Sequence, residues 1–241
     1  MPLRLPLSAA PSGNAGLTPA CTTAGNTAFV IGTNMQDLHV SAGTDEMFLE
    51  VCNIDASPHQ LVGSFHYGAI TAPDDLFYQT MAPQSGWQKI VGGDILLAGA
   101  GLALGLPGSG DLNKLNFRGF VNRIIGDARK LPLSGAGTYN KNIKLSGTAV
   151  GSATTLHTAV AGNAQMDEVY LNLTNTSANP VQVTLCIGGT TSACQMVLTI
   201  PGQSGWTQAL AGESLNNGLA VSAFAATANV INARGWANRI S

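Results

Sequence analysis

RGFVNRI, residues 118–124, returns near the end of the chain as RGWANRI, residues 234–240, with only the third and fourth positions changed. Upstream of the two heptapeptides the match continues in the same order. DEMFLEVCNIDASPHQLV (45–62) aligns without gaps on DEVYLNLTNTSANPVQVT (167–184), and the two share Asp, Glu, Leu, Asn, Ala, Pro and Gln. The sequence therefore predicts an internal duplication.

Two shorter motifs recur in the same order. QSGW occurs at 84–87 and 203–206, and LPLS occurs at 5–8 and 131–134. The spacing between matched motifs is about 115 to 126 residues, which is the size of a domain rather than of a short solenoid repeat. A chain of 241 residues that is 45% hydrophobic can also bury two cores. We therefore expect two domains of the same kind.

Apolar and polar residues alternate in the second copy, at 169–174 and again at 181–187. A period of two is typical of half-buried β-strands. The runs are separated by NTSANP, GGTTSA, PGQSG and LNNG, whose Gly, Pro, Asn and Ser residues favour turns. No segment shows a convincing helical stripe. The sequence predicts an all-β protein, with two tandem β-sandwich or jelly-roll domains of about seven or eight strands each.

Proline, glycine, serine and alanine are concentrated in two segments, residues 1–25 and 127–147. Proline cannot donate to the interior of a sheet, so we expect extended arms or additions to a sheet edge. The predicted order is an N-terminal arm at 1–25, a first sandwich at 26–126, a connecting arm at 127–147 and a second sandwich at 148–241.

Four aromatic residues occupy equivalent places in the two copies. RGFVNRI and RGWANRI are predicted to be closing strands, with Phe120 and Trp236 turned inward. Trp87 and Trp206 each follow Ser-Gly, and we expect both to be mostly buried at a sandwich end. The alternative is a platform for sugar stacking or an anchor in a protein interface.

Charged residues make up 10% of this chain, against about 25% in ordinary soluble domains. So little charge suits a protein in lasting contact with other proteins, and equally a small all-β protein with many glycine turns. Residues 1–126 hold five Lys/Arg and nine Asp/Glu, a net charge of −4, whereas residues 127–241 hold six and four, a net charge of +2. No basic cluster is dense enough to predict nucleic-acid binding.

Pro2, Pro6 and Pro11 interrupt the apolar residues near the start, so we expect neither a signal peptide nor a membrane span. Cys186 and Cys194 are the only close pair of cysteines. Alternation places them on opposite faces of a hairpin, which favours free thiols over a disulfide or a zinc site.

The histidines (His39, His59, His66, His157) and the acids Asp37, Asp55, Asp74 and Asp75 are the candidates for acid-base pairs. Only His39 has a counterpart, His157, and we find no matched carboxylate close to either in sequence. Asp45 and Asp167 are interpreted as solvated strand starts. No nucleophile motif is present, so we predict no enzyme activity, no cofactor and no metal, although a site built from distant residues stays open.

The hairpin HYGAITAPDD (66–75) is longer than its counterpart and carries two acids. Loops change without disturbing a core, so this divergence predicts a different neighbour for each copy. A duplicated arm also implies a duplicated groove. The candidate partner contacts are therefore Leu5, Pro6, Leu7, Asp74, Asp75, Leu131, Pro132 and Leu133.

Four motifs stand in a fixed order: Asp-Glu-x-aromatic-Leu-x-x-x-Asn-x-x-Ala, Val-Thr-Leu-x-x-Gly-Gly-Thr, Ser-Gly-Trp and Arg-Gly-aromatic-x-Asn-Arg-Ile. This order resembles the small β-sandwich virion proteins of tailed bacteriophages, in particular capsid decoration (cement) proteins. Members of that family are often single sandwiches, whereas this chain carries two.

The resemblance implies a structural protein of the virion, assembled in the host cytoplasm as part of a large symmetric lattice. Its partners would be the major capsid protein and neighbouring copies of itself, with neither nucleic acid nor membrane. The alternatives are a neck or tail structural protein and a carbohydrate-binding adhesin module.

Overall fold

The computed structural model describes residues 3–6, 36–67, 76–105, 114–124, 130–137 and 141–240. Regular structure in these ranges is β-strand apart from three short 3-10 turns, so the all-β prediction is confirmed. The chain divides into two units, one made of residues 1–72 and 78–126 and the other of residues 73–77 and 127–241.

Eight strands precede the connector in the part of the chain that the structure describes. They are β1 (Leu3–Pro6), β2 (Gln36–Val40), β3 (Asp45–Asn53), β4 (His59–Tyr67), β5 (Leu76–Met81), β6 (Gly86–Leu96), β7 (Ala100–Gly105) and β8 (Leu115–Arg123).

Nine strands follow among the described residues of the second unit. They are β9 (Lys130–Pro132), β10 (Ile143–Lys144), β11 (Thr154–Thr158), β12 (Met166–Asn175), β13 (Val181–Ile187), β14 (Gln195–Ile200), β15 (Thr207–Leu215), β16 (Ala220–Ala225) and β17 (Ile231–Ile240). The 3-10 turns are η3 (Ser134–Ala136), η4 (Val150–Ser152) and η5 (Ser192–Cys194).

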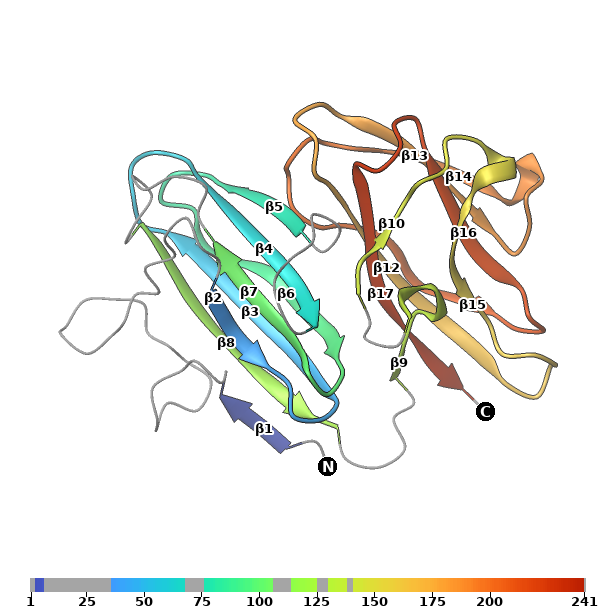
Figure 1. The fold of residues 1–241 in the computed structure, drawn as a ribbon, viewed down its shortest axis with the longest axis horizontal. Coiled ribbons are helices and arrows are strands. Elements are labelled where there is room, and N and C mark those ends of the chain that lie inside the picture. The colour runs from blue at the N-terminus through green and yellow to red at the C-terminus, as the bar shows by residue number, and fades with distance from the viewer. Residues whose placement is uncertain are drawn as a thin grey trace. The chain divides into compact units, whose positions relative to one another are not determined.

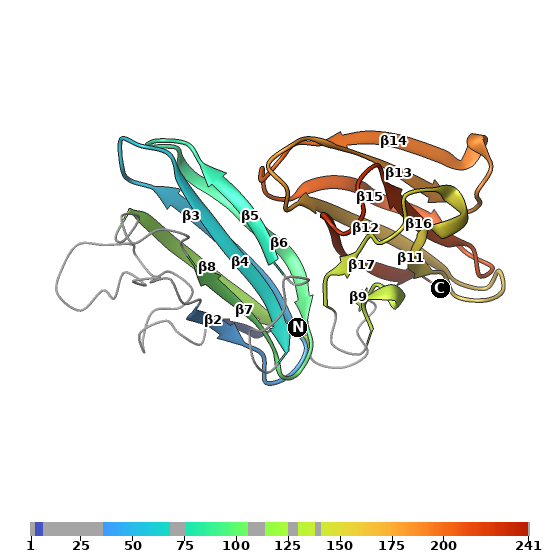
Figure 2. The same cartoon turned by 45° about the horizontal axis from the view of Figure 1, so that its top comes forward.

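The strand order of the second unit repeats that of the first. The first unit has one sheet in the order β1-β8-β3-β6 and another in the order β2-β7-β4-β5 (Figure 1). The second has β17-β12-β15, with β9 and β10 both added to β17, and a sheet in the order β11-β16-β13-β14 (Figure 2). Each strand of one unit thus has a counterpart at the same position in the other, and β10 is the addition.

Side-chain alternation explains how the sheets bury their cores. In β3 every second residue is buried, and β12 follows the same pattern over most of its length. The core of the second unit takes side chains from both of its sheets, including Leu171 of β12, Leu185 of β13 and Ala233 of β17. One core therefore joins the two sheets of that unit.

Irregularities in the pairing also recur. The register between β3 and β6 shifts after Met47 and again after Leu49, and the register between β12 and β15 shifts at the matched places, after Val169 and Leu171. Near these shifts Gly93 and Gly212 have φ of 92° and 89°. Only glycine adopts such angles without strain, so the two bulges depend on these glycines.

Candidate functional site

The two LPLS arms pair with the last strand of their units in the same register. In β1, Pro6 lies opposite Phe120 of β8, and in β9 Pro132 lies opposite Trp236 of β17. The neighbouring leucines lie opposite the equivalent residues Val121 and Ala237. Both arms are thus additions to a sheet edge, where a proline without an N–H is tolerated.

The candidate contact residues of the arms have different surroundings. Leu133 is 1% exposed and belongs to the core of its own unit, whereas Leu131 and Pro132 are half-buried in β9. Leu5 and Pro6 lie in β1. Leu7, Asp74 and Asp75 are outside the described residues.

The aromatic residues of the closing strands are not turned inward, so that prediction is wrong. Val121 and Ala237 fill the inward positions at 0% exposure. Trp236 instead stacks on Tyr170 with ring centroids 5.3 Å apart, and Phe120 stacks on Phe48 in the same way at 4.8 Å. Both stacks are cross-strand pairs on the face opposite the core.

Lys130 of β9 covers the other side of Trp236, with its Nζ 4.0 Å from the ring centroid. Because β9 and β12 flank β17 on its two sides, the indole lies between a cation and the Tyr170 ring. Neither face of Trp236 is left for a sugar to stack on. The stacked side chains of Lys130, Trp236 and Tyr170 hold the arm against the sheet.

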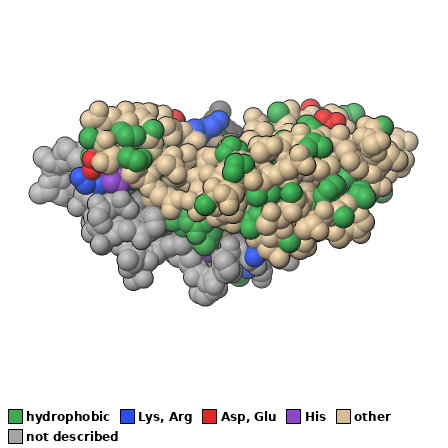
Figure 3. Space-filling model, turned by 90° about the horizontal axis from the view of Figure 1, so that it is seen from above, with side chains coloured by type: hydrophobic (Ala, Val, Ile, Leu, Met, Phe, Trp, Pro, Cys, Tyr) green, Lys and Arg blue, Asp and Glu red, His purple; other side chains and the backbone are tan. Residues whose placement is uncertain are grey.

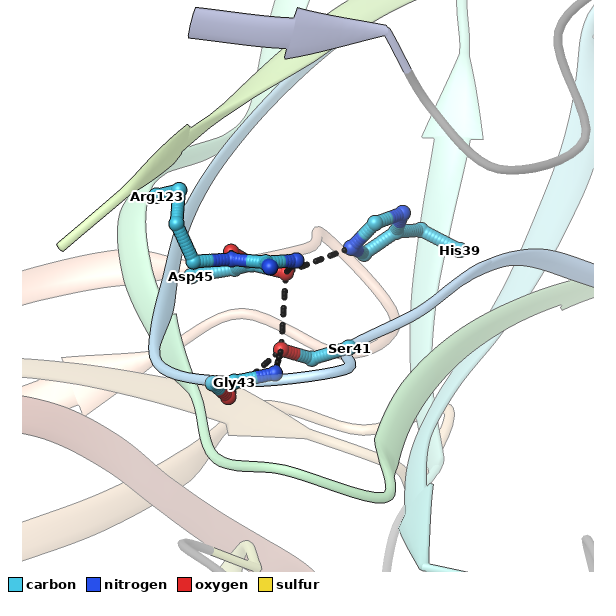
Figure 4. Close-up of polar contacts among 5 residues, drawn as sticks. All are labelled: His39, Ser41, Gly43, Asp45 and Arg123. Carbon is cyan, nitrogen blue, oxygen red and sulfur yellow. Dashed lines mark hydrogen bonds and ion pairs between the residues drawn. The ribbon is translucent and has the colours of Figure 1, made fainter. Parts of the chain in front are cut away.

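A cluster of four polar side chains is centred on a buried carboxylate in the first unit. The Asp45 carboxylate is 0% exposed and lies between the Arg123 guanidinium, the His39 ring and the Ser41 hydroxyl (Figure 4). His39 Nε2 is 3.0 Å from Asp45 Oδ2, and Ser41 Oγ donates to the same oxygen at 2.7 Å. Arg123 donates through Nε to Oδ1 and through Nη2 to Oδ2, the second at 3.0 Å.

The second unit repeats this cluster with Asp167 at its centre. His157 Nε2 lies 3.1 Å from Oδ2, and Arg239 donates to the two oxygens at 2.8 and 3.0 Å. The backbone N–H of Val160 takes the place of the serine hydroxyl at 3.1 Å. Ser134, in the arm, donates its backbone N–H to His157 Nδ1.

Both aspartates are ionised in the folded protein. Burial acts to raise the pKa of Asp45, but hydrogen bonds from His39, Arg123 and Ser41 outweigh it and hold that pKa well below its usual value. The pKa of Asp167 is lowered in the same way, against burial, chiefly by Arg239 and His157. Asp45 and Asp167 are therefore not the solvated strand starts that the sequence suggested.

The contacts of this cluster join strands. The Ser41 hydroxyl lies 2.7 Å from both Asp45 Oδ2 and the Gly43 carbonyl oxygen, and its one proton can be donated to either acceptor. The cluster joins β2 of one sheet to β3 and β8 of the other. The Asp45 carboxylate is fully buried and accepts hydrogen bonds at both oxygens, so it holds these strands together.

Sequence reasoning missed these clusters because it looked for a carboxylate near each histidine and set aside the acids of the aligned segments. The available signal was the recurrence of three residue types: a histidine, the Asp of Asp-Glu and the Arg of Asn-Arg-Ile all occur in both copies. Taken together, they marked one site per unit.

Two further histidines of the first unit do contact acids. His66 Nε2 lies 2.6 Å from Asp37 Oδ1, and His59 Nε2 lies 3.4 Å from Asp55 Oδ2. Lys114 also contacts Asp55, at 2.5 Å. The residues aligned with Asp55 and His59 in the second copy are Ser177 and Val181, so that pair has no counterpart there.

A buried asparagine shapes the turn after β3 and after β12. Asn175 donates through Nδ2 to the carbonyls of Asn179 and Ile200 at 2.7 and 3.1 Å, and its Oδ1 accepts from the Ser177 N–H at 2.9 Å. Asn53 makes the equivalent contacts with Ser57 and with Met81. The shared Asn of the two aligned segments therefore ties each turn to the following strand.

The QSGW turns present their tryptophans differently. Gln84 and Gln203 share a left-handed backbone, with φ of 45° and 48°. Trp87 is 38% exposed, so the prediction that it is mostly buried is wrong, whereas Trp206 is half-buried.

Among the described residues, no group of three or more His, Cys, Asp or Glu side chains is arranged to hold a metal ion. No helix in the described part of the chain has the length and apolar character to cross a membrane.

No protein-family model matches the chain, and no curated protein matches it. Among solved structures, a tandem CBM22 domain from Paenibacillus barcinonensis Xyn10C matches at 12% identity and a TM-score of 0.24, over 83% of this chain and 79% of the other. A Broad Bean Stain Virus structure matches at 7% identity and a TM-score of 0.28, over 100% and 88%. Vicilin from Solanum lycopersicum matches at 6% and 0.20, over 86% and 75%. Scores this low carry no argument about fold or function.

Proposed function

We propose that the chain is a structural protein of a tailed-phage virion that decorates and stabilises the capsid lattice. In this proposal its two units are tandem β-sandwich domains that arose by internal duplication. The partners would be the major capsid protein and neighbouring copies of the chain itself. The resemblance in the ordered sequence motifs suggests this role, and the following features support it.

The observation that carries the proposal is that both units repeat the same internal contacts, namely the paired arm and the Asp-His-Arg cluster. The arms pair in matched register, and in each unit a buried Asp and His, with a partly exposed Arg, join strands of the two sheets. A framework of this kind provides two rigid surfaces and no chemistry. A lattice-binding protein needs rigid contact area that symmetry repeats many times.

The sparse charge of the chain supports the same proposal. Charged side chains are few on the face that Figure 3 presents, where backbone, small polar and apolar atoms predominate. Surface ion pairs contribute only about 0 to 1 kcal/mol each, so such a face must bind through area and shape. Many weak contacts repeated over a lattice can hold a protein that has no single strong anchor.

A carbohydrate-binding adhesin module is the second candidate, because Trp87 is 38% exposed at the start of β6. An exposed indole offers a face for a sugar ring. Trp236 does not add to this platform, since Lys130 and Tyr170 cover its two faces. A neck or tail structural protein remains the alternative within the virion.

Binding to purified heads tests the proposal. Heads prepared without the protein should take it up to a fixed number of sites per lattice unit, and the loaded heads should resist heating better than bare heads. A Trp87→Ala variant should bind heads as the parent does. Binding to a glycan array that Trp87→Ala abolishes, without binding to heads, would replace this proposal with the adhesin.

A further inference from the structure

Residues 130–137 form a clip that joins the two sheets of the second unit; we call this segment the clip. Its first part, β9, pairs with β17 of one sheet. Leu133 then enters the core, and η3 packs against β11 of the other sheet. The fit is close, because a Cβ on Gly135 would collide with the Thr155 carbonyl oxygen.

His157 of β11 is the polar attachment point of the clip. Its ring is 3% exposed and bonds at both nitrogens. The Ser134 backbone N–H donates to Nδ1 at 3.2 Å, and the Ser134 hydroxyl accepts from the Thr158 N–H at 2.8 Å. Because Nδ1 is an acceptor here, the ring proton is on Nε2, from which it is donated to Asp167 at 3.1 Å. The ring is neutral when the clip is docked.

A second proton can bind this ring only at Nδ1, and the Ser134 N–H already donates to that nitrogen. Nε2 is already protonated, so the proton must bind Nδ1, where it would point at the Ser134 N–H. Two donors would then face each other in a buried site, and the bond between the clip and β11 would be lost.

We propose that His157 is a pH-sensitive latch: protonation at Nδ1 releases residues 130–137 from β11 and opens the clip of the second unit. The inference rests on the geometry of one unit and is independent of the proposed virion function.

The charged groups around the ring determine how the latch responds to pH. Asp167 of β12 faces Nε2 and favours the charged ring, whereas Arg239 of β17 disfavours it. No titratable side chain faces the ring from η3, and Val221 of β16, opposite His157, is apolar. Burial is the largest influence and lowers the pKa of His157 from its usual value.

The direction of the pH dependence follows from this lowered pKa. The docked state holds a neutral histidine, and in the released state water reaches Nδ1, so the pKa of the ring moves back toward its ordinary value of about 6.5. The released state therefore binds more protons in acid, so docking is favoured above about pH 6.5 and weakens as the pH falls below it. One proton linked to release predicts a tenfold change in the docking equilibrium per pH unit, until the pKa of the docked ring is reached.

Amide hydrogen exchange of the full chain between pH 4.5 and 8, corrected for the intrinsic exchange rate at each pH, measures the latch. The Ser134 amide should lose protection about tenfold per pH unit below about pH 6.5. The amide of Leu171, in the core strand β12, should keep its protection over the same range. Constant protection of Ser134, or a parallel loss at Leu171, would overturn the proposal.

His157→Asn provides the control, because its side-chain oxygen can accept the Ser134 N–H and it does not titrate. In this variant the protection of the Ser134 amide from exchange should be independent of pH. If that variant does not fold, the ring nitrogen chemical shifts of the unmodified protein decide the matter. They should show the Nε2–H form at pH 8 and protonation of Nδ1 in step with the loss of Ser134 protection. An Nδ1–H form at pH 8 would refute the latch.

Discussion

Arg239 holds the buried Asp167 carboxylate with two hydrogen bonds, Nε to Oδ1 at 2.8 Å and Nη2 to Oδ2 at 3.0 Å. Arg123 holds Asp45 in the first unit through the same pair of nitrogens. Asp-Glu and Asn-Arg-Ile are more than seventy residues apart in each copy, and the pairing of β3 with β8 and of β12 with β17 brings them together. The duplicated motifs are thus the two ends of one ion pair.

Removing Arg239 should destabilise the second unit strongly. Arg239→Ala leaves Asp167 charged at 0% exposure with its main partner gone. Because the Arg239 side chain is itself 34% exposed, we expect a loss of about 1 to 3 kcal/mol, less than a fully buried pair would cost. Arg239→Lys, which has one donor group in place of the planar fork, should lose less. Urea unfolding measures both, with Glu168→Ala on the opposite face as the control. Equal stability of Arg239→Ala and the parent would show that the pair does not support the fold.

Acid should destabilise the fold through the same two aspartates. The folded-state pKa values of Asp45 and Asp167 are lowered, so the unfolded chain binds more protons than the folded chain below about pH 4. The stabilisation is present above that pH and is lost as the pH falls, by at most about 1.4 kcal/mol per pH unit for each carboxylate. Urea midpoints measured from pH 2 to pH 7 test this.

An Asp167→Asn variant serves as the comparison for that titration. It should be less stable at pH 7 and should show a shallower loss of stability in acid, because one titrating group is gone. A variant with the slope of the parent protein would mean that other carboxylates dominate the acid response.

Gly235 of β17 should tolerate no side chain. A Cβ there would collide with the Tyr170 carbonyl oxygen across the β12–β17 pairing. Gly235→Ala must therefore push the two strands apart, and we expect a loss of at least about 3 kcal/mol or failure to fold. Gly151→Ala is the matched control, since a Cβ at Gly151 would meet nothing within 4 Å. Thermal unfolding that is the same for both variants would contradict the strand pairing.

Much of the all-β fold could be predicted from local patterns, because alternation and turn residues are written into each strand. The face of the sheet on which the aromatic residues of the closing strands lie could not be predicted in this way. Size favours the core for Phe120 and Trp236, yet the alternation of β17 places Gly235 and Ala237 on the inward phase. In the first unit Val121 takes the same inward position as Ala237. The buried clusters also escaped prediction, because burial of Asp45 depends on contacts with Arg123, which is distant in sequence.

The two acids of the hairpin at 66–75 should affect binding rather than folding. The first copy carries a net charge of −4, and these residues make up part of it. Asp74→Asn with Asp75→Asn should leave the melting temperature almost unchanged and reduce occupancy on heads, most clearly at low salt, where charge is least screened. Glu213→Gln, an exposed acid of the second unit, is the control. A reconstruction with both halves sitting interchangeably on equivalent sites would rule out distinct partners.

The number of copies per particle tests the proposed role most directly. Quantitative mass spectrometry of purified virions, scaled to the major capsid protein, supplies that number. Decoration of the capsid lattice predicts hundreds of copies, in a fixed ratio to the major capsid protein. A count of about six or twelve, as expected for a ring at the neck or tail, or absence from the particle, would contradict it.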